Sequence, residues 1–118
     1  MSNLVSWNLQ LNVRDGQLNA SQSLMKEMIE ATQKESGTRM YQWFYSNDGK
    51  TCHITEGYTD SSAVMVHLGT FGSTFVERFM ACFEPTSFFV YGNPSAEARA
   101  VLDGFGAAYL DSVDGFTR

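Results

Sequence analysis

The sequence has few basic residues and no long apolar run. Its 118 residues include 8 lysines and arginines against 13 aspartates and glutamates, which gives a net charge of -5. Because the basic residues form no cluster, nucleic acid is not an expected partner. No stretch reaches the length of a membrane helix, and the start, MSNLVSWNLQ, lacks the charged and apolar regions of a signal peptide. We therefore expect a cytoplasmic protein with no membrane contact.

Cysteine and histidine are also scarce. The sequence has 2 of each, namely Cys52, Cys82, His53 and His67, and their spacing matches no zinc motif. We therefore predict no metal site, and we expect both cysteines to be reduced thiols. The length and the lack of a linker or repeat favour a single domain over residues 1–118.

The most informative stretch covers residues 39–68. Asp48-Gly49 between two alternating runs predicts a hairpin with a two-residue type I′ turn, which requires positive φ at both central residues. Pairing outward from this turn defines two faces. One face carries Tyr45 with Cys52, Trp43 with Ile54, Tyr41 with Glu56 and Arg39 with Tyr58. The other face carries Phe44 with His53, Gln42 with Thr55 and Met40 with Gly57.

After the hairpin, the apolar period changes from two residues to that of a helix. Asp60 is a candidate N-cap, and the next helical stripe consists of Val64, His67, Leu68 and Phe71. Because this stripe must meet the sheet to bury its apolar members, we expect His67 to point at the sheet. Gly69 and Gly72 are predicted to interrupt the helix. A capping box over residues 74–77 then restarts it, with Phe75 and Phe79 facing inward.

The flanking segments alternate between strands and helices. We predict a strand over 4–13, a helix from 18 to about 35 with Gly37 as its C-cap, a strand over 86–91, a helix over 94–103 and a fifth strand over 107–113. The resulting order, βαββαβ, is the ferredoxin-like α+β arrangement, in which two helices cover one sheet face. The face with Met40, Phe44 and His53 is left open, and we expect a homodimer to bury it.

Three segments resemble the antibiotic biosynthesis monooxygenase family, which includes quinol monooxygenase-like proteins. They are ESGTRMYQW (35–43), DG (48–49) and EGYTDSSAVMVHL (56–68). The element order extends the resemblance to about residue 91, so that 1–92 is the core and 93–118 an extension. The resemblance implies a dimeric α+β barrel built sheet to sheet, with an apolar pocket in each subunit. Some members oxidise quinols or polyketide anthrones with molecular oxygen and without metal or flavin, so no cofactor is implied.

Such chemistry needs an aromatic pocket and a base, because a quinol or anthrone must lose a proton before it can readily pass an electron to oxygen. His67 is the candidate base or hydrogen-bond partner, and Glu56 is placed to orient His67 or a substrate hydroxyl. The candidate substrate-binding residues are aromatic: Tyr41, Trp43, Tyr58, Phe71, Phe75 and Phe79. Each candidate also has a structural interpretation, as a hydrogen-bonded core histidine, as core aromatics, or as a carboxylate bound to Tyr41 or Arg39.

A haem-degrading branch of the same fold has an asparagine on the first strand, a tryptophan on the second helix and a later haem-ligating histidine. Asn8 or Asn12 fits the first position, but Trp7 and Trp43 lie on predicted strands and no histidine follows His67. The sequence therefore disfavours haem degradation.

Two functions stay open. One is a cofactor-independent monooxygenase of a quinol, an anthrone or another phenolic small molecule. The other is a non-catalytic dimer that binds a small molecule or has a structural role.

Overall fold

The computed structural model describes residues 3–118. Its strands are β1 (Val5–Val13), β2 (Thr38–Tyr45), β3 (Thr51–Tyr58), β4 (Phe83–Tyr91) and β5 (Ala108–Leu110), and they form one sheet in the order β2-β3-β1-β4-β5. β5 pairs with β4 in parallel, whereas the other pairs are antiparallel. This is a ferredoxin-like sheet with one added edge strand, so the predicted α+β fold is confirmed.

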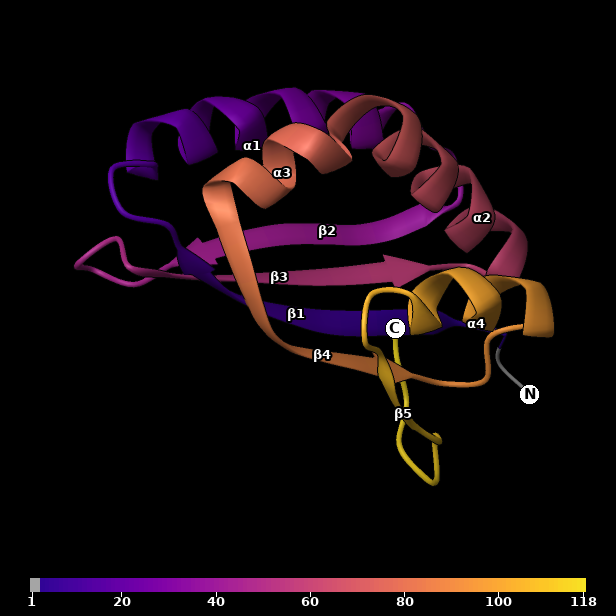
Figure 1. The fold of residues 1–118 in the computed structure, drawn as a ribbon. Coiled ribbons are helices and arrows are strands. Elements are labelled where there is room, and N and C mark those ends of the chain that lie inside the picture. The colour runs from indigo at the N-terminus through magenta and orange to yellow at the C-terminus, as the bar shows by residue number, and fades with distance from the viewer. Residues whose placement is uncertain (1–2) are drawn as a thin grey trace.

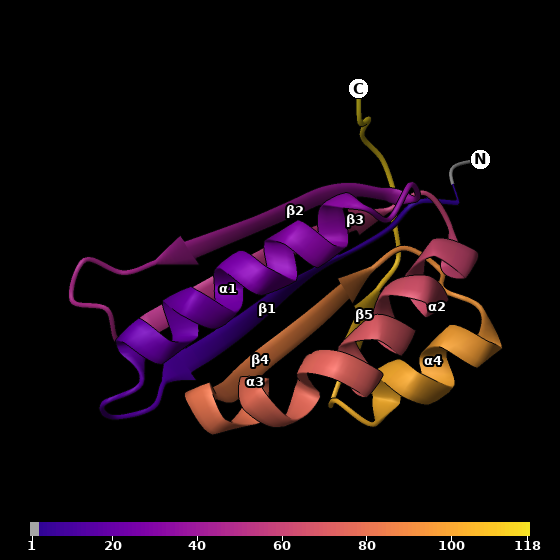
Figure 2. The same ribbon diagram turned by 90° about the horizontal axis from the view of Figure 1, so that it is seen from above.

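The helical segments are α1 (Leu18–Gln33), α2 (Ser61–Thr70), the π-helix η1 (Phe71–Phe75), α3 (Val76–Cys82) and α4 (Ala96–Asp103). Figures 1 and 2 show α1, α2 and α3 over one face of the sheet, with α4 beside α2. The segment after β5 extends from the opposite side (Figure 1). None of the helices described within residues 3–118 is long and apolar enough to cross a membrane.

Strict alternation in β1 explains how the core forms. Val5, Trp7 and Leu11 are at most 3% exposed on the helix-covered face, where they join two neighbouring apolar clusters. Burying each large apolar side chain contributes about 1.5–3 kcal/mol. The polar residues of β1 lie on the open face of the sheet, which none of the helices within residues 3–118 covers (Figure 1).

The predicted hairpin register is confirmed from Tyr45↔Cys52 to Met40↔Gly57. It is wrong at the far end, where a bulge lets Thr38 rather than Arg39 pair with Tyr58. The predicted turn type is also wrong. Of the two central residues, Asp48 and Gly49, only Gly49 has positive φ (73°), whereas a type I′ turn requires it at both. The Asp48 side chain instead accepts hydrogen bonds from Ser46 Oγ (2.7 Å) and Lys50 N (3.0 Å), which shapes a wider loop around the same register.

Gly37 has a different role from the predicted C-cap. It has no positive φ, and the C-cap of α1 is Lys34, in a right-handed conformation. A Cβ at Gly37 would lie 2.5 Å from Ala63 Cβ, and Thr59 N donates to Gly37 O at 3.0 Å. Glycine is therefore required here because the turn before β2 packs directly against the first turn of α2.

The predicted break and restart of the second helix is also wrong. α2 continues through η1 into α3, and no side chain caps the start of α3. The helical hydrogen bonds satisfy the backbone groups that the capping box at 74–77 would have served, so that motif is not used. Phe75 and Phe79 are buried as predicted, at 7% and 3% exposure.

Two other element starts differ from prediction. β4 begins at Phe83, three residues before the predicted start. The strand includes Pro85 because this proline lies beside a register shift in the pairing with β1. α4 begins at Ala96, since Ser95 accepts a hydrogen bond from Ala98 N and caps the helix.

Replacing Gly37 by alanine is expected to destabilise the protein by about 1–3 kcal/mol, because the new methyl group overlaps Ala63. The matched control is Gly69→Ala in α2, where an added Cβ has no neighbour within 4 Å and should raise stability by about 1 kcal/mol. Urea unfolding of both variants measures the difference. Equal stability of the two variants would contradict the packing role of Gly37.

Candidate active site

His67 occupies the sheet-facing side of α2. Asp60 fixes the start of this helix by accepting a hydrogen bond from Ala63 N at 2.9 Å, as its predicted N-cap role requires. Val64 and Leu68 lie on the same stripe and are buried, so the helix cannot rotate without exposing them. His67 is held inside with only 6% of its surface exposed.

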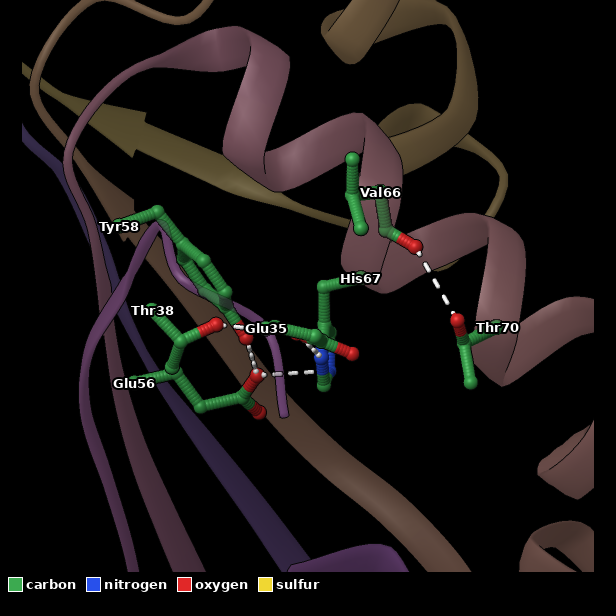
Figure 3. A network of polar contacts seen from close by, with 7 residues as sticks. All are labelled: Glu35, Thr38, Glu56, Tyr58, Val66, His67 and Thr70. Carbon is green, nitrogen blue, oxygen red and sulfur yellow. Dashed lines mark hydrogen bonds and ion pairs between the residues drawn. The ribbon is translucent and has the colours of Figure 1, made fainter. Parts of the chain in front are cut away.

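Two carboxylates flank the His67 ring (Figure 3). Nδ1 lies 3.0 Å from Glu35 Oε1, and Nε2 lies 3.2 Å from Glu56 Oε1. Tyr58 Oη donates to the same oxygen of Glu56 at 2.5 Å, and Thr38 Oγ1 donates to Glu35 Oε1 at 2.9 Å. The ring is therefore fixed at both nitrogens, and both carboxylates have a further hydroxyl donor.

Three separate elements bring this network together. β3 carries Glu56, which faces Tyr41 on β2 and Trp7 on β1 across the sheet. Glu35 comes from the turn after α1, which the close approach of Gly37 to Ala63 holds against α2. The second oxygen of Glu35, Oε2, is buried and has no hydrogen-bond partner within the described residues. Its contact with His67 is therefore the main compensation for burying the Glu35 carboxylate.

The two carboxylates control the charge of His67. Burial opposes protonation, but hydrogen bonds and attraction to Glu35 and Glu56 prevail and raise the pKa of His67 to about 9. At neutral pH the ring is therefore an imidazolium that donates from both nitrogens. Burial, reinforced by the charge of Glu56, raises the pKa of both Tyr58 and Tyr41, so these phenols stay neutral.

Aromatic rings surround the charged imidazole. The ring centres of Tyr58 and Tyr41 lie 5.2 Å and 5.5 Å from that of His67, and the Trp7 ring lies at 6.4 Å. Such rings exclude water and present polarisable surface to a cation. The ion pairs consequently act in an apolar environment, where electrostatic interactions are stronger than in water.

A cavity of about 230 Å³ lies beside this network. Glu56 and His67, at 4% and 6% exposure, form its inner end, whereas Met80 and Phe105, at 40% and 41%, lie at the exposed end. Nearly all other wall residues are apolar: Trp7, Leu9, Met28, Tyr41, Ile54, Leu68, Phe71, Phe79, Pro85, Phe88 and Gly104. The arrangement can hold an apolar molecule with an oxygen-bearing group at its inner end.

The structure separates the proposed aromatic residues into two groups. Tyr41, Phe71 and Phe79 line the cavity. The other three do not: Tyr58 is a fully buried donor to Glu56, and Trp43 and Phe75 belong to the second apolar cluster, where Trp43 packs against Phe83 at 5.9 Å. Their sheet or helix face was predicted correctly, but facing inward does not distinguish a cavity wall from a filled core.

Sequence reasoning missed three residues of the site: Glu35, Trp7 and Phe105. The pattern of β1 does place Trp7 on the inward face, and pairing β1 with β3 would have set it opposite Glu56. Glu35 and Phe105 carry no comparable signal, since both follow the ends of helices, where exposed side chains are common.

The described residues do not form a metal centre beside this network or elsewhere. Within residues 3–118, no group of three or more histidine, cysteine, aspartate or glutamate side chains is arranged to hold a metal ion. Cys52 and Cys82 are both buried and unbonded. Burial raises the pKa of the Cys52 thiol to about 12, so it is not a nucleophile at neutral pH.

No protein-family model and no curated protein sequence matches the chain. Solved structures do match. MupZ from Pseudomonas fluorescens is 20% identical with a TM-score of 0.84, and the match covers 100% of this chain and 91% of that chain. SnoaB from Streptomyces nogalater, a cofactor-independent oxygenase, is 12% identical with a TM-score of 0.67 and covers 80% of this chain and 97% of that chain.

A Nitrosomonas europaea protein, provisionally described as an antibiotic biosynthesis monooxygenase, is 17% identical with a TM-score of 0.69. That match covers 79% of this chain and 92% of the other. The resemblance to antibiotic biosynthesis monooxygenases is therefore confirmed for the fold. The MupZ match covers the whole chain and so includes the C-terminal extension, whereas the other two matches cover 79% and 80% of it.

The network predicts a specific pH dependence of stability. The pKa of His67 is raised from 6.5 to about 9 on folding, so the stability that it contributes is complete below about pH 6.5 and is lost as the pH rises through 9. The expected loss is on the order of 3 kcal/mol. Urea unfolding between pH 6 and 10 measures this slope, and His67→Gln should flatten it.

Direct titration provides a check that does not depend on the stability of a variant. The Cε1–H signal of His67 in NMR spectra should titrate near pH 9 in the wild type and at lower pH in Glu35→Gln, because one of the two carboxylates is then lost. A midpoint near 6.5 in the wild type would contradict the proposed charge state.

Proposed function

We propose that the protein is a cofactor-independent monooxygenase that acts on a quinol, an anthrone or another small phenolic molecule. The proposal rests chiefly on one observation, namely that a carboxylate paired with a charged imidazole forms the inner end of an otherwise apolar cavity. This combination can remove a proton from a hydroxyl group and stabilise the anion that results. The likeness in fold to a cofactor-independent oxygenase is consistent with it.

The two residues take different roles in this proposal. Because His67 is protonated at neutral pH, it cannot serve as the base, and its charge instead stabilises the substrate anion. Glu56 is the base. Both of its hydrogen bonds, from Tyr58 and His67, reach Oε1, which leaves Oε2 for the substrate hydroxyl (Figure 3).

The overall reaction then requires only the substrate and molecular oxygen. Loss of the proton raises the energy of the ring electrons, so the anion can reduce oxygen directly. One oxygen atom is added to a ring carbon, the substrate loses two hydrogen atoms, and the second oxygen atom leaves as water. The apolar walls exclude bulk water from the anion and from the partly reduced oxygen.

Oxygen uptake with a panel of hydroquinones and anthrones tests this function. Glu56→Gln should lower kcat by about 10²–10⁴, the usual contribution of an acid–base group. His67→Gln should lower it as well, since it removes the positive charge beside the anion. Arg78→Gln, which changes an exposed ion pair on α3, is the control and should have no effect. A protein that binds these compounds without taking up oxygen would instead be a binding protein.

We also propose that the protein is a homodimer joined through the open face of the sheet. That face carries large apolar side chains with 36–50% exposure: Met40, Phe44, Phe89 and Tyr91. His53 is half-buried opposite Phe44. Met40 and Phe44 lie on β2, and Phe89 and Tyr91 lie on β4, on either side of the polar residues of β1. Exposed apolar side chains of this size favour association with a second copy over contact with water.

Sedimentation at micromolar concentration should therefore show a dimer. Phe44→Glu should shift the protein toward monomer, because a charge would be buried in the interface. Val66→Glu is the matched control: Val66 is 58% exposed on α2, on the helix side of the sheet, and its substitution should leave the dimer intact. A monomeric wild type would refute the proposal.

A further inference from the structure

The exposed end of the cavity is formed by segments that are far apart in sequence. α3 contributes Met80, β4 contributes Pro85, and the loop between α4 and β5 contributes Gly104 and Phe105. All four residues are exposed, in contrast to Glu56 and His67 at the inner end. A ligand from solvent must therefore pass between α3 and this loop, so the C-terminal extension forms one side of the entrance.

The backbone of this loop is anchored, and a ring contact with Phe71 holds the Phe105 side chain at the cavity. Phe105 N donates to Leu102 O and Gly106 N donates to Asp103 O, both at 3.0 Å, and Leu102 is fully buried. The only ring contact of Phe105 within the described residues is an edge-on one with Phe71, at 5.8 Å between centres. With 41% of its surface exposed, the ring can turn away from the cavity only by giving up this contact with Phe71.

The size and polarity of the cavity define what fits while Phe105 is in place. Its volume of about 230 Å³ is below the range of about 300–1,000 Å³ of most ligand pockets, which favours a small ligand. The wall contains no lysine or arginine among the described residues, so it has no group to pair with a carboxylate or phosphate. Because the polar groups lie at the inner end, a ligand must enter with its oxygen first.

We propose that Phe105 is the residue that limits ligand size, admitting neutral phenols of one or two fused rings and opposing larger ones. This inference deepens the proposed function, since it concerns the ligand of the same cavity, and among the proposed substrates it favours one- and two-ring phenols such as quinols over three-ring anthrones. The phenol oxygen contacts Glu56, the rings lie against the edge-on pair of Phe71 and Phe79, and the far edge of the second ring meets Phe105. A third fused ring would have to displace the Phe105 side chain.

Calorimetric binding of 2-naphthol and 9-phenanthrol tests the inference. Wild-type protein should bind the two-ring probe at least tenfold more tightly than the three-ring probe. Phe105→Ala should reverse this preference, and Phe105→Leu should give an intermediate ratio. Phe116→Ala is the control, because Phe116 is an 80% exposed aromatic residue in the same extension, and it should leave the ratio unchanged. Naphthalene, which lacks the oxygen, should bind the wild type more weakly than 2-naphthol.

The outcomes separate this inference from the proposed function. An unchanged ratio in Phe105→Ala, or no binding of either probe to folded wild-type protein, would overturn the role of Phe105. A reversed ratio without oxygen uptake for any phenol would support Phe105 as the size limit and count against the monooxygenase. Oxygen uptake that depends on Glu56, combined with an unchanged ratio in Phe105→Ala, would support the monooxygenase and overturn the role of Phe105.

Discussion

The site depends on burying two carboxylates and one imidazole together. Removing any one of these groups from water alone would cost several kcal/mol, and only their mutual contacts offset that cost. Those contacts require three elements to converge within hydrogen-bond distance: the turn after α1, β3 and α2. The geometry of the fold at this end is thus determined by charge compensation as well as by apolar packing.

Several local features serve this convergence. Gly37 allows the turn that carries Glu35 to approach Ala63, and Asp60 fixes where α2 begins, so that His67 lies on its inner side. The π-helix then adds a residue to the helical turn and changes the phase of α3 relative to α2. Phe71, its first residue, lines the cavity, whereas Phe75, its last, lies in the core. π-Helical segments occur frequently at functional sites, and this one borders the cavity.

Local patterns in the sequence were sufficient for most of the fold. Alternation and the 48–49 turn signal gave the hairpin register, and with it the inward direction of Glu56, because a slip of one residue would have mixed the two faces. The helical stripe gave the direction of His67. The pairing of Glu35 with His67 was not predictable in this way, since it depends on two turns that meet only in the folded chain.

The same limit explains the other errors. Gly37 was expected to be a C-cap because glycine often ends a helix, but here it is required by a neighbour 26 positions away in sequence, Ala63. Whether an inward aromatic residue lines a cavity or fills the core depends on how closely the opposite layer packs. Tyr41 and Trp43 are two residues apart on the same face of β2, yet of the two only Tyr41 lines the cavity.

The charge balance of the network bears on which ligands can react there. Two carboxylates, Glu35 and Glu56, flank the one imidazolium, so the network has no unpaired positive charge to attract a ligand that is already anionic. In the proposed reaction a neutral phenol enters, and transfer of its proton to Glu56 leaves the total charge of the site unchanged. The proposed phenolate would form next to the imidazolium in an apolar cavity, where their attraction is strong. Activation of the substrate for reaction with oxygen would thus require the movement of one proton within the cavity and no exchange of charge with solvent.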